Sequence, residues 1–174
     1  MNDIFDGRGL GPEVIMQAIK LVCADVDGVL TDGKLYYQAD GTHLKAFNAR
    51  DGLGIKLLIA AGVRVAFITG LQSPSIEHRA HDLGAECYFA EQDKAGVVLG
   101  LLEKYGLTPS ELACIGDDIQ DREMLKLAAF AFCPLDAHVD ITRIYRIIKL
   151  RKCGGAGAFR AMSDLILATK EQRR

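Results

Sequence analysis

The stretch KLVCADVDGV at residues 20–29 decides the fold class. Lys20–Val26 is a short, mostly apolar run, with the length and composition of a buried strand. Asp25 and Asp27 lie at its carboxyl end and, two residues apart on an extended chain, share one face. Gly28 then permits a sharp turn out of the strand. We interpret the segment as the first strand of a sheet that ends in two carboxylates.

The rest of the chain alternates short apolar runs with longer amphipathic ones. The further strands are predicted at Val63–Thr69, Glu86–Phe89, Ala113–Ile115 and Ala129–Cys133. Helices are predicted at Leu53–Ala61, Ser75–Leu83, Lys94–Tyr105, Arg122–Ala128 and about 157–170. This alternation is typical of an α/β fold with a doubly wound parallel sheet covered on both faces. With 174 residues and 49% hydrophobic content, we expect residues 1–174 to form a single domain.

One segment departs from the alternation. Lys34–Phe47 contains two extended runs on either side of Asp40-Gly41. Asp-Gly is a preferred pair for a two-residue hairpin turn, in which both residues adopt positive φ. We expect a β-hairpin that projects from the sheet just after the first strand.

Polar residues suited to phosphoryl transfer follow the predicted strands. Asp25 and Asp27 end the first strand, Thr69 ends the second, Lys94 opens the helix after the third, and Asp117 follows the fourth. Ligands of parallel sheets bind beyond the carboxyl ends of the strands. A carboxylate there can attack phosphorus, and a second one can transfer protons. Carboxylates also suit Mg²⁺, while Lys and Thr suit phosphate oxygens.

These motifs make the chain resemble the haloacid-dehalogenase superfamily of phosphatases. The superfamily's four motifs are matched by DVDGV (25–29), ITG (68–70), Lys94 and GDDIQD (116–121). Within it the chain is most similar to the 3-deoxy-D-manno-octulosonate 8-phosphate phosphatase family. That closer match rests on DVDGVLTDG (25–33), KAFNARDGLGIKLL (45–58) and GGAGAFR (154–160). The resemblance implies a Mg²⁺-dependent phosphomonoesterase that hydrolyses this sugar-acid phosphate through an aspartyl phosphate. The scattered cysteines, without paired spacing, predict a cytoplasmic protein.

The resemblance also implies a role for each matched residue. Asp25 is the nucleophile and a metal ligand, and Asp27 is the general acid and base whose carbonyl contacts the metal. Thr69 and Lys94 bind the phosphoryl group. Asp117 is the third metal contact, and Asp121 supports that site from the same loop.

The spacing leaves no room for a cap domain over the site. Between Asp27 and Thr69, and between Thr69 and Lys94, the expected hairpin, helices and strands use most of the chain. The resemblance therefore implies a homotetramer in which neighbouring hairpins complete each active-site mouth. Arg50 and Arg79 are then candidates to bind the substrate carboxylate, with Lys45 a weaker one. Leu71 and Ala161 depart from the family pattern, which usually has Arg and Glu there, and both bear on sugar specificity or the subunit contact.

Composition argues against several other classes of protein. Lys plus Arg number 21 and Asp plus Glu number 23, for a net charge of −2, so nucleic acid is not the expected partner. No apolar run reaches the roughly 18 residues of a membrane span. The five cysteines show no paired metal-binding spacing.

Two alternative functions stay open on the sequence. The first is a related phosphatase of the acylneuraminate 9-phosphate type, which shares the chemistry and differs in the sugar. The second is a catalytically silent tetramerising module of the same fold, although every core catalytic position is present here.

Overall fold

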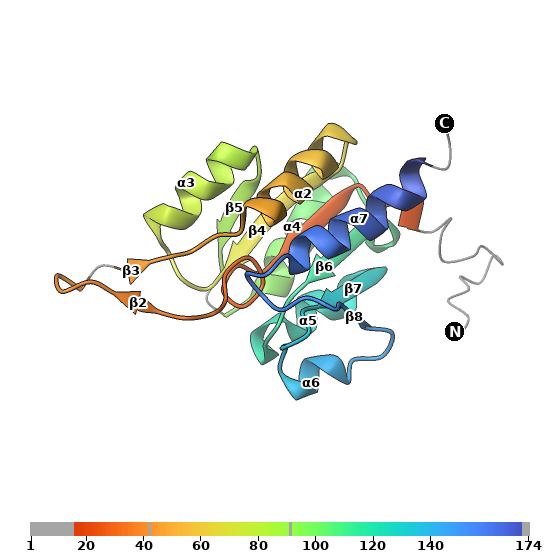
Figure 1. Ribbon diagram of the computed structural model, residues 1–174. Helices are drawn as coiled ribbons and strands as arrows, with labels where there is room; N and C mark the ends of the chain where they lie inside the picture. Colours follow the sequence, from red (N-terminus) through yellow and green to blue (C-terminus); the bar gives the residue numbers. More distant parts are fainter. Residues whose placement is uncertain (1–15, 42, 91, 172–174) are drawn as a thin grey trace.

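The computed structural model describes residues 16–41, 43–90 and 92–171. Its central feature is one sheet of six parallel strands in the order β5-β4-β1-β6-β7-β8 (Figure 1). The strands are β1 (Leu21–Ala24), β4 (Arg64–Thr69), β5 (Glu86–Phe89), β6 (Leu112–Ile115), β7 (Phe130–Cys133) and β8 (Ile148–Lys149). The predicted parallel α/β sheet is confirmed.

Strand β1 lies at the point where the chain reverses direction across the sheet. Ala24 pairs with Phe67 of β4 on one side and with Ile115 of β6 on the other. All four β1 residues are fully buried, since helices cover both faces. The chain proceeds from β1 to β4 and β5, then crosses to β6 and onward. Such a reversal opens a crevice at the carboxyl ends of the central strands.

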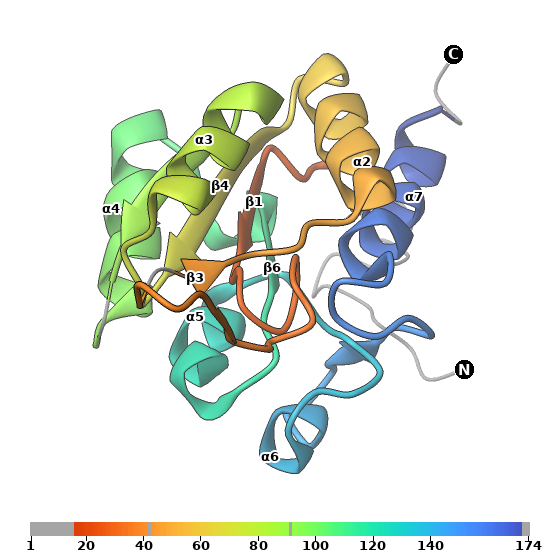
Figure 2. The same ribbon diagram turned by 60° about the vertical axis from the view of Figure 1, so that its left-hand side comes forward.

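Two apolar layers flank the sheet. Helices α2 (Ala49–Ala60), α3 (Pro74–Leu83) and α7 (Ala158–Glu171) pack on one face, and α2 and α7 lie side by side (Figure 2). Helices α4 (Lys94–Tyr105), α5 (Arg122–Leu127) and α6 (Val139–Thr142) pack on the other face. Alternate β1 residues point into the two layers, Val22 into the first and Cys23 into the second. None of the helices in the described ranges is both long and apolar enough to cross a membrane.

The hairpin is present, but its predicted turn is wrong. Strands β2 (Tyr36–Tyr37) and β3 (His43–Leu44) pair antiparallel, and the hairpin projects from the sheet (Figure 1). Five residues rather than two connect them, and Gly41 N donates to Gln38 O at 3.0 Å. Gly41 has φ +84°, whereas Asp40 does not adopt positive φ. The two-residue turn needs positive φ at both positions, a condition that Gly41 meets and Asp40 does not.

Helix ends and short elements account for the other differences. Helix α2 begins at Ala49, four residues before the predicted start, because the Asn48 side chain accepts from Arg50 N at 2.8 Å and caps it. Helix α6 and strand β8 were not predicted; they have four and two residues, too short for a periodic pattern.

Candidate functional site

Two turns meet beyond β1 and β6 because of a glycine. Asp25 N donates to Ile115 O at 3.0 Å, which continues the sheet one residue past β1. The chain then turns through Gly28, whose φ is +95°. A Cβ on Gly28 would lie 2.0 Å from Asp117 Oδ2. Only glycine therefore allows the turn after β1 to approach the turn after β6 so closely.

Lys94 joins three of the elements at this edge. It is the first residue of α4, after the N-cap Asp93. Its Nζ lies 2.5 Å from Asp25 Oδ1 and 2.6 Å from Asp121 Oδ1. All three side chains are at most 5% exposed. One buried cation thus compensates two buried carboxylates, which would otherwise be strongly disfavoured away from water.

Asp121 organises the turn after β6. Its Oδ2 accepts from the backbone N of Asp117 at 2.9 Å and of Asp118 at 3.2 Å. Its other oxygen is held by Lys94. Asp121 therefore shapes the backbone that presents Asp117.

The arrangement fits a hard divalent cation. One carboxylate oxygen from each of Asp25, Asp117 and Asp121 lies within 4.8 Å of the others. Asp117 Oδ1 is buried and has no hydrogen-bond partner within the described part of the chain. A buried acceptor of this kind needs a partner, and oxygen ligands are what Mg²⁺ or Ca²⁺ prefers. The described residues therefore provide an acceptor set with room for a metal ion.

Proton affinities at the edge reflect the crowding of carboxylates. Burial, and then Asp121, raises the pKa of Asp117 to about 7. Burial also raises the pKa of Asp25, with Asp121 adding to the effect and Lys94 opposing it. Burial lowers the pKa of Lys94, but Asp25 and Asp121 outweigh it and leave that pKa raised. A cation among the carboxylates would relieve their mutual repulsion.

Asp27 stands slightly apart from this cluster. Both of its carboxylate oxygens lie 2.6 Å from Lys45 Nζ, and Thr31 Oγ1 donates to Oδ1 at 3.0 Å. Its side chain is 29% exposed, so it faces the solvent side of the edge while Asp25 lies deeper. An exposed, fixed carboxyl is accessible to a substrate oxygen or to water.

Thr69 shares a small cleft with the two aspartates. Asp25, Asp27, Thr69, Gly70, Leu71 and Gln120 line a cleft of about 190 Å³. Ligand pockets more often span roughly 300–1,000 Å³. The cleft of one chain holds a phosphoryl group more readily than a whole sugar phosphate, and the 39% exposed Leu71 lies at its rim.

Arg50 and Arg79 do not line that cleft. Arg50 is exposed on the first turn of α2. Arg79 lies above the Phe47 ring, and its Nη2 donates to Asn48 O at 3.4 Å. Within one chain, Arg79 therefore contacts the start of α2. Neither arginine reaches the acidic edge, by which we mean Asp25, Asp27, Asp117 and Asp121 at the carboxyl ends of β1 and β6. Their predicted contact with the substrate carboxylate stays a prediction.

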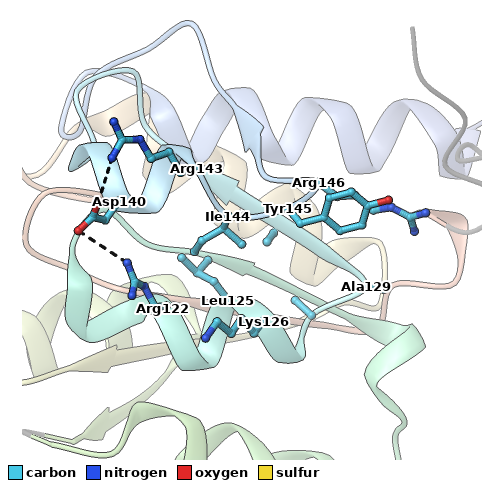
Figure 3. A pocket seen from close by; sticks show the side chains of 11 residues that line it. Arg122, Leu125, Lys126, Ala129, Asp140, Arg143, Ile144, Tyr145 and Arg146 are labelled. Atoms are coloured by element: carbon cyan, nitrogen blue, oxygen red, sulfur yellow. Dashed lines mark ion pairs between the residues drawn. The ribbon is translucent and has the colours of Figure 1, made fainter.

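A larger hollow beside α5 lacks the chemistry of the acidic edge. Its volume is about 680 Å³, and basic and apolar side chains line it (Figure 3). Its one carboxylate, on Asp140, is paired with Arg122 at 3.7 Å and Arg143 at 3.6 Å. With no free carboxylate to attack phosphorus or transfer a proton, the hollow does not compete as a reaction site.

The contact between Lys45 and Asp27 was not predicted from the sequence. Lys45 follows β3 directly, 18 residues beyond Asp27. No local spacing links a lysine after a hairpin to an aspartate before it. A lysine inside an otherwise extended, largely apolar stretch was the available signal, since lysine is seldom buried without a partner.

Comparisons with known proteins agree on one family, although no protein-family model matches the chain. The chain is 40% identical over 153 residues to the 3-deoxy-D-manno-octulosonate 8-phosphate phosphatase KdsC of Haemophilus influenzae, covering 87% of this chain and 84% of that one. It is 37% identical over 159 residues to the Escherichia coli K12 protein of the same name, covering 89% and 84%.

Solved structures lead to the same family. The cobalt-bound Haemophilus influenzae phosphatase superposes with a TM-score of 0.85 at 39% identity, covering 90% of this chain and 92% of that one. The Moraxella catarrhalis phosphatase, in complex with magnesium, phosphate and KDO, superposes with a TM-score of 0.87 at 34% identity, covering 92% of each chain.

Proposed function

The chain belongs to the family of 3-deoxy-D-manno-octulosonate (KDO) 8-phosphate phosphatases, in the haloacid-dehalogenase superfamily, and we propose that its acidic edge performs this hydrolysis. The proposal is carried by one observation: Asp25, Asp117 and Asp121 converge at the switch point of the sheet, with Lys94 bridging Asp25 and Asp121. Asp27 lies two residues beyond Asp25 on the exposed side of the same turn.

The first half-reaction is transfer of the phosphoryl group to Asp25. A carboxylate oxygen of Asp25 attacks phosphorus in line with the sugar oxygen, so that an acyl–phosphate bond forms while the phosphorus–sugar oxygen bond breaks. Asp27 gives its proton to the departing sugar oxygen. Lys94 stabilises negative charge beside Asp25, and Thr69 provides a hydroxyl in the same cleft.

The second half-reaction returns Asp25 to its starting state. Asp27, now ionised, takes a proton from a water molecule whose oxygen attacks phosphorus. The acyl–phosphate bond breaks, orthophosphate leaves, and Asp25 regains its carboxylate. When bound, Mg²⁺ neutralises charge on the phosphoryl oxygens and on the acidic cluster. Asp25, Asp117 and the Asp27 carbonyl are the proposed ligands, and Asp121 supports the Asp117 loop. The Mg²⁺-bound Moraxella catarrhalis relative supports this choice of metal.

The substrate contacts beyond the phosphate involve a second subunit in this proposal. One chain encloses only about 190 Å³ at the acidic edge. The hairpin exposes Leu35, Tyr36, Tyr37 and Leu44, each more than 40% exposed. Apolar side chains gathered on a projecting element are typical of an assembly surface. We therefore propose a cytoplasmic homotetramer whose hairpins complete each mouth, where Arg50 and Arg79 meet the sugar carboxylate of a neighbouring site.

The nucleophile is tested by replacing Asp25 with asparagine. Asp25→Asn should abolish turnover while the far-ultraviolet circular dichroism and the melting temperature stay close to those of the wild type. Rapid acid quench and peptide mass spectrometry should find a phosphorylated Asp25 peptide in the wild type alone. A variant that retains more than about a tenth of wild-type kcat would remove Asp25 from the nucleophile role, because losing a nucleophile costs orders of magnitude.

A further inference from the structure

A second buried lysine serves the acidic edge, and it contacts Asp27 rather than Asp25. Lys45 Nζ lies 2.6 Å from both carboxylate oxygens of Asp27, and the Lys45 side chain is only 2% exposed. An ammonium group removed from water needs a counter-charge, and Asp27 provides it. Lys94, by contrast, contacts Asp25 and Asp121. Asp25 and Asp27 therefore each contact a different buried lysine.

Two groups together fix the direction of the Asp27 carboxylate. Lys45 contacts both of its oxygens, and Thr31 Oγ1 donates to Oδ1. Thr31 is itself oriented, because its Oγ1 accepts from Gly33 N at 3.2 Å. Rotation of Asp27 out of this position would break both contacts and leave a buried ammonium without a partner. The side chain is therefore held before any substrate arrives.

Lys45 also connects the acid/base residue to the hairpin. It follows β3 directly and precedes Asn48, the N-cap of α2. Asn48 Nδ2 donates to Gly155 O at 3.0 Å, which anchors that end of the segment to the loop before α7. Lys45 thus lies between a fixed helix start and the projecting hairpin.

We propose that Lys45 is a positioning residue for Asp27. It holds the Asp27 carboxyl in the direction of the leaving oxygen. This inference rests on the phosphatase mechanism above, in which Asp27 carries the proton. Proton transfer requires the correct geometry of Asp27. The contribution of Lys45 to kcat should therefore be greater for a leaving group that needs a proton.

The test compares two phosphate esters that differ in this need. A sugar alkoxide is a poor leaving group and needs the proton, whereas p-nitrophenolate leaves without it. Lys45→Met should lower kcat for KDO 8-phosphate about 100-fold, within the range for loss of acid–base catalysis. Its kcat for p-nitrophenyl phosphate should fall less than about fivefold, because that reaction does not use the proton. The matched control is Lys104→Met, an exposed lysine of α4 that is paired with Glu86, and it should behave as the wild type on both esters.

Two further variants separate positioning from folding. Lys45→Gln keeps a long polar side chain without the charge, and should repeat the leaving-group dependence if Lys45→Met does not fold. Lys45→Arg should recover part of kcat on the sugar ester. Equal losses on both esters, or a change confined to KM, would overturn the inference.

If the proposed function is wrong, the wild type releases no phosphate from KDO 8-phosphate in a Mg²⁺-dependent way. This result differs from one that overturns only the role of Lys45. In that case phenyl and p-nitrophenyl phosphate provide the poor and the good leaving group. A Lys45→Met loss greater on phenyl phosphate supports the inference, and equal losses overturn it.

Discussion

At the scale of single residues, metal binding at the acidic edge depends on which carboxylate oxygens have no hydrogen-bond partner in the described part of the chain. Asp121 has both oxygens engaged, by Lys94 on one side and by two backbone N–H groups on the other. Asp117 has a buried Oδ1 without a partner in the described part of the chain. In the proposed function, Asp121 therefore shapes the loop and Asp117 binds the metal ion. Sequence spacing grouped them at this edge but could not assign their oxygens.

The raised pKa of Asp117 predicts how Mg²⁺ binding depends on pH. Burial and Asp121 raise this pKa to about 7, so below that pH a proton occupies the carboxyl that the metal needs. The apparent Mg²⁺ affinity should fall as the pH drops from 8 to 6, by up to about tenfold per pH unit for each proton displaced. Calorimetric Mg²⁺ titrations at both pH values measure this, and equal affinities would contradict it.

The raised pKa of Asp117 also makes the free energy of unfolding of the metal-free protein depend on pH. A carboxyl whose pKa is raised above its model value of 3.8 binds more protons in the folded than in the unfolded state. Its contribution to the free energy of unfolding is therefore lost as the pH rises from about 4 to about 7. Mg²⁺ should raise the melting temperature more at pH 8 than at pH 5. A Mg²⁺ effect greater at pH 5 would refute this reading.

At the scale of elements, the predicted strands and long helices agree with the structure because their apolar periods are strong. Glu86–Phe89 and Lys94–Tyr105 were predicted with the observed bounds. The hairpin turn was not, since the Asp-Gly pair also suits a longer loop in which Gly41 has positive φ and Asp40 does not. The start of α2 was placed late because the N-cap Asn48, rather than the first apolar residue, determines where the helix starts. The conformation of the hairpin turn and the start of α2 depend on local polar contacts and backbone conformation, which the apolar periodicity of the sequence does not indicate.

Asn48 should stabilise the packing of α2 beside α7. Its Oδ1 caps α2 and its Nδ2 donates to Gly155 O at 3.0 Å. Asn48→Ala loses both contacts and should lower the free energy of unfolding by about 2 kcal/mol. Asn48→Asp keeps the cap and loses the second contact, so its loss should be about half as large. Urea denaturation measures both, and an alanine variant within about 0.5 kcal/mol of the wild type would show that neither contact matters.

At the scale of the whole molecule, a single chain leaves its reaction site open. The sheet places the proposed catalytic groups at one edge, while the hairpin extends beyond that sheet (Figure 1). The open mouth follows from sequence spacing, because no insertion is long enough for a cap domain. In the proposed tetramer, contacts between chains enclose the sugar, and the sequence pattern of one chain does not specify those contacts.

The proposed assembly predicts the effect of a charge on the hairpin. Leu44 is 56% exposed on β3, and Leu44→Glu should place a carboxylate inside the proposed subunit contact. The wild type should elute with the mass of a tetramer in size-exclusion chromatography with light scattering, and the variant as smaller species. Leu99→Glu, at a residue 52% exposed on α4, is the matched control and should stay tetrameric. A monomeric wild type, or an unaffected Leu44 variant, would contradict the assembly.

The most direct test of the proposed function is phosphate release by the purified wild type from KDO 8-phosphate, with Mg²⁺ and then with a chelator. N-acetylneuraminate 9-phosphate and p-nitrophenyl phosphate are measured beside it, and Asp25→Asn is the blank. We expect rapid, Mg²⁺-dependent release from KDO 8-phosphate, at a far greater kcat/KM than from the other two esters. A folded wild type that releases phosphate from none of the three, or equally well with chelator, would contradict it.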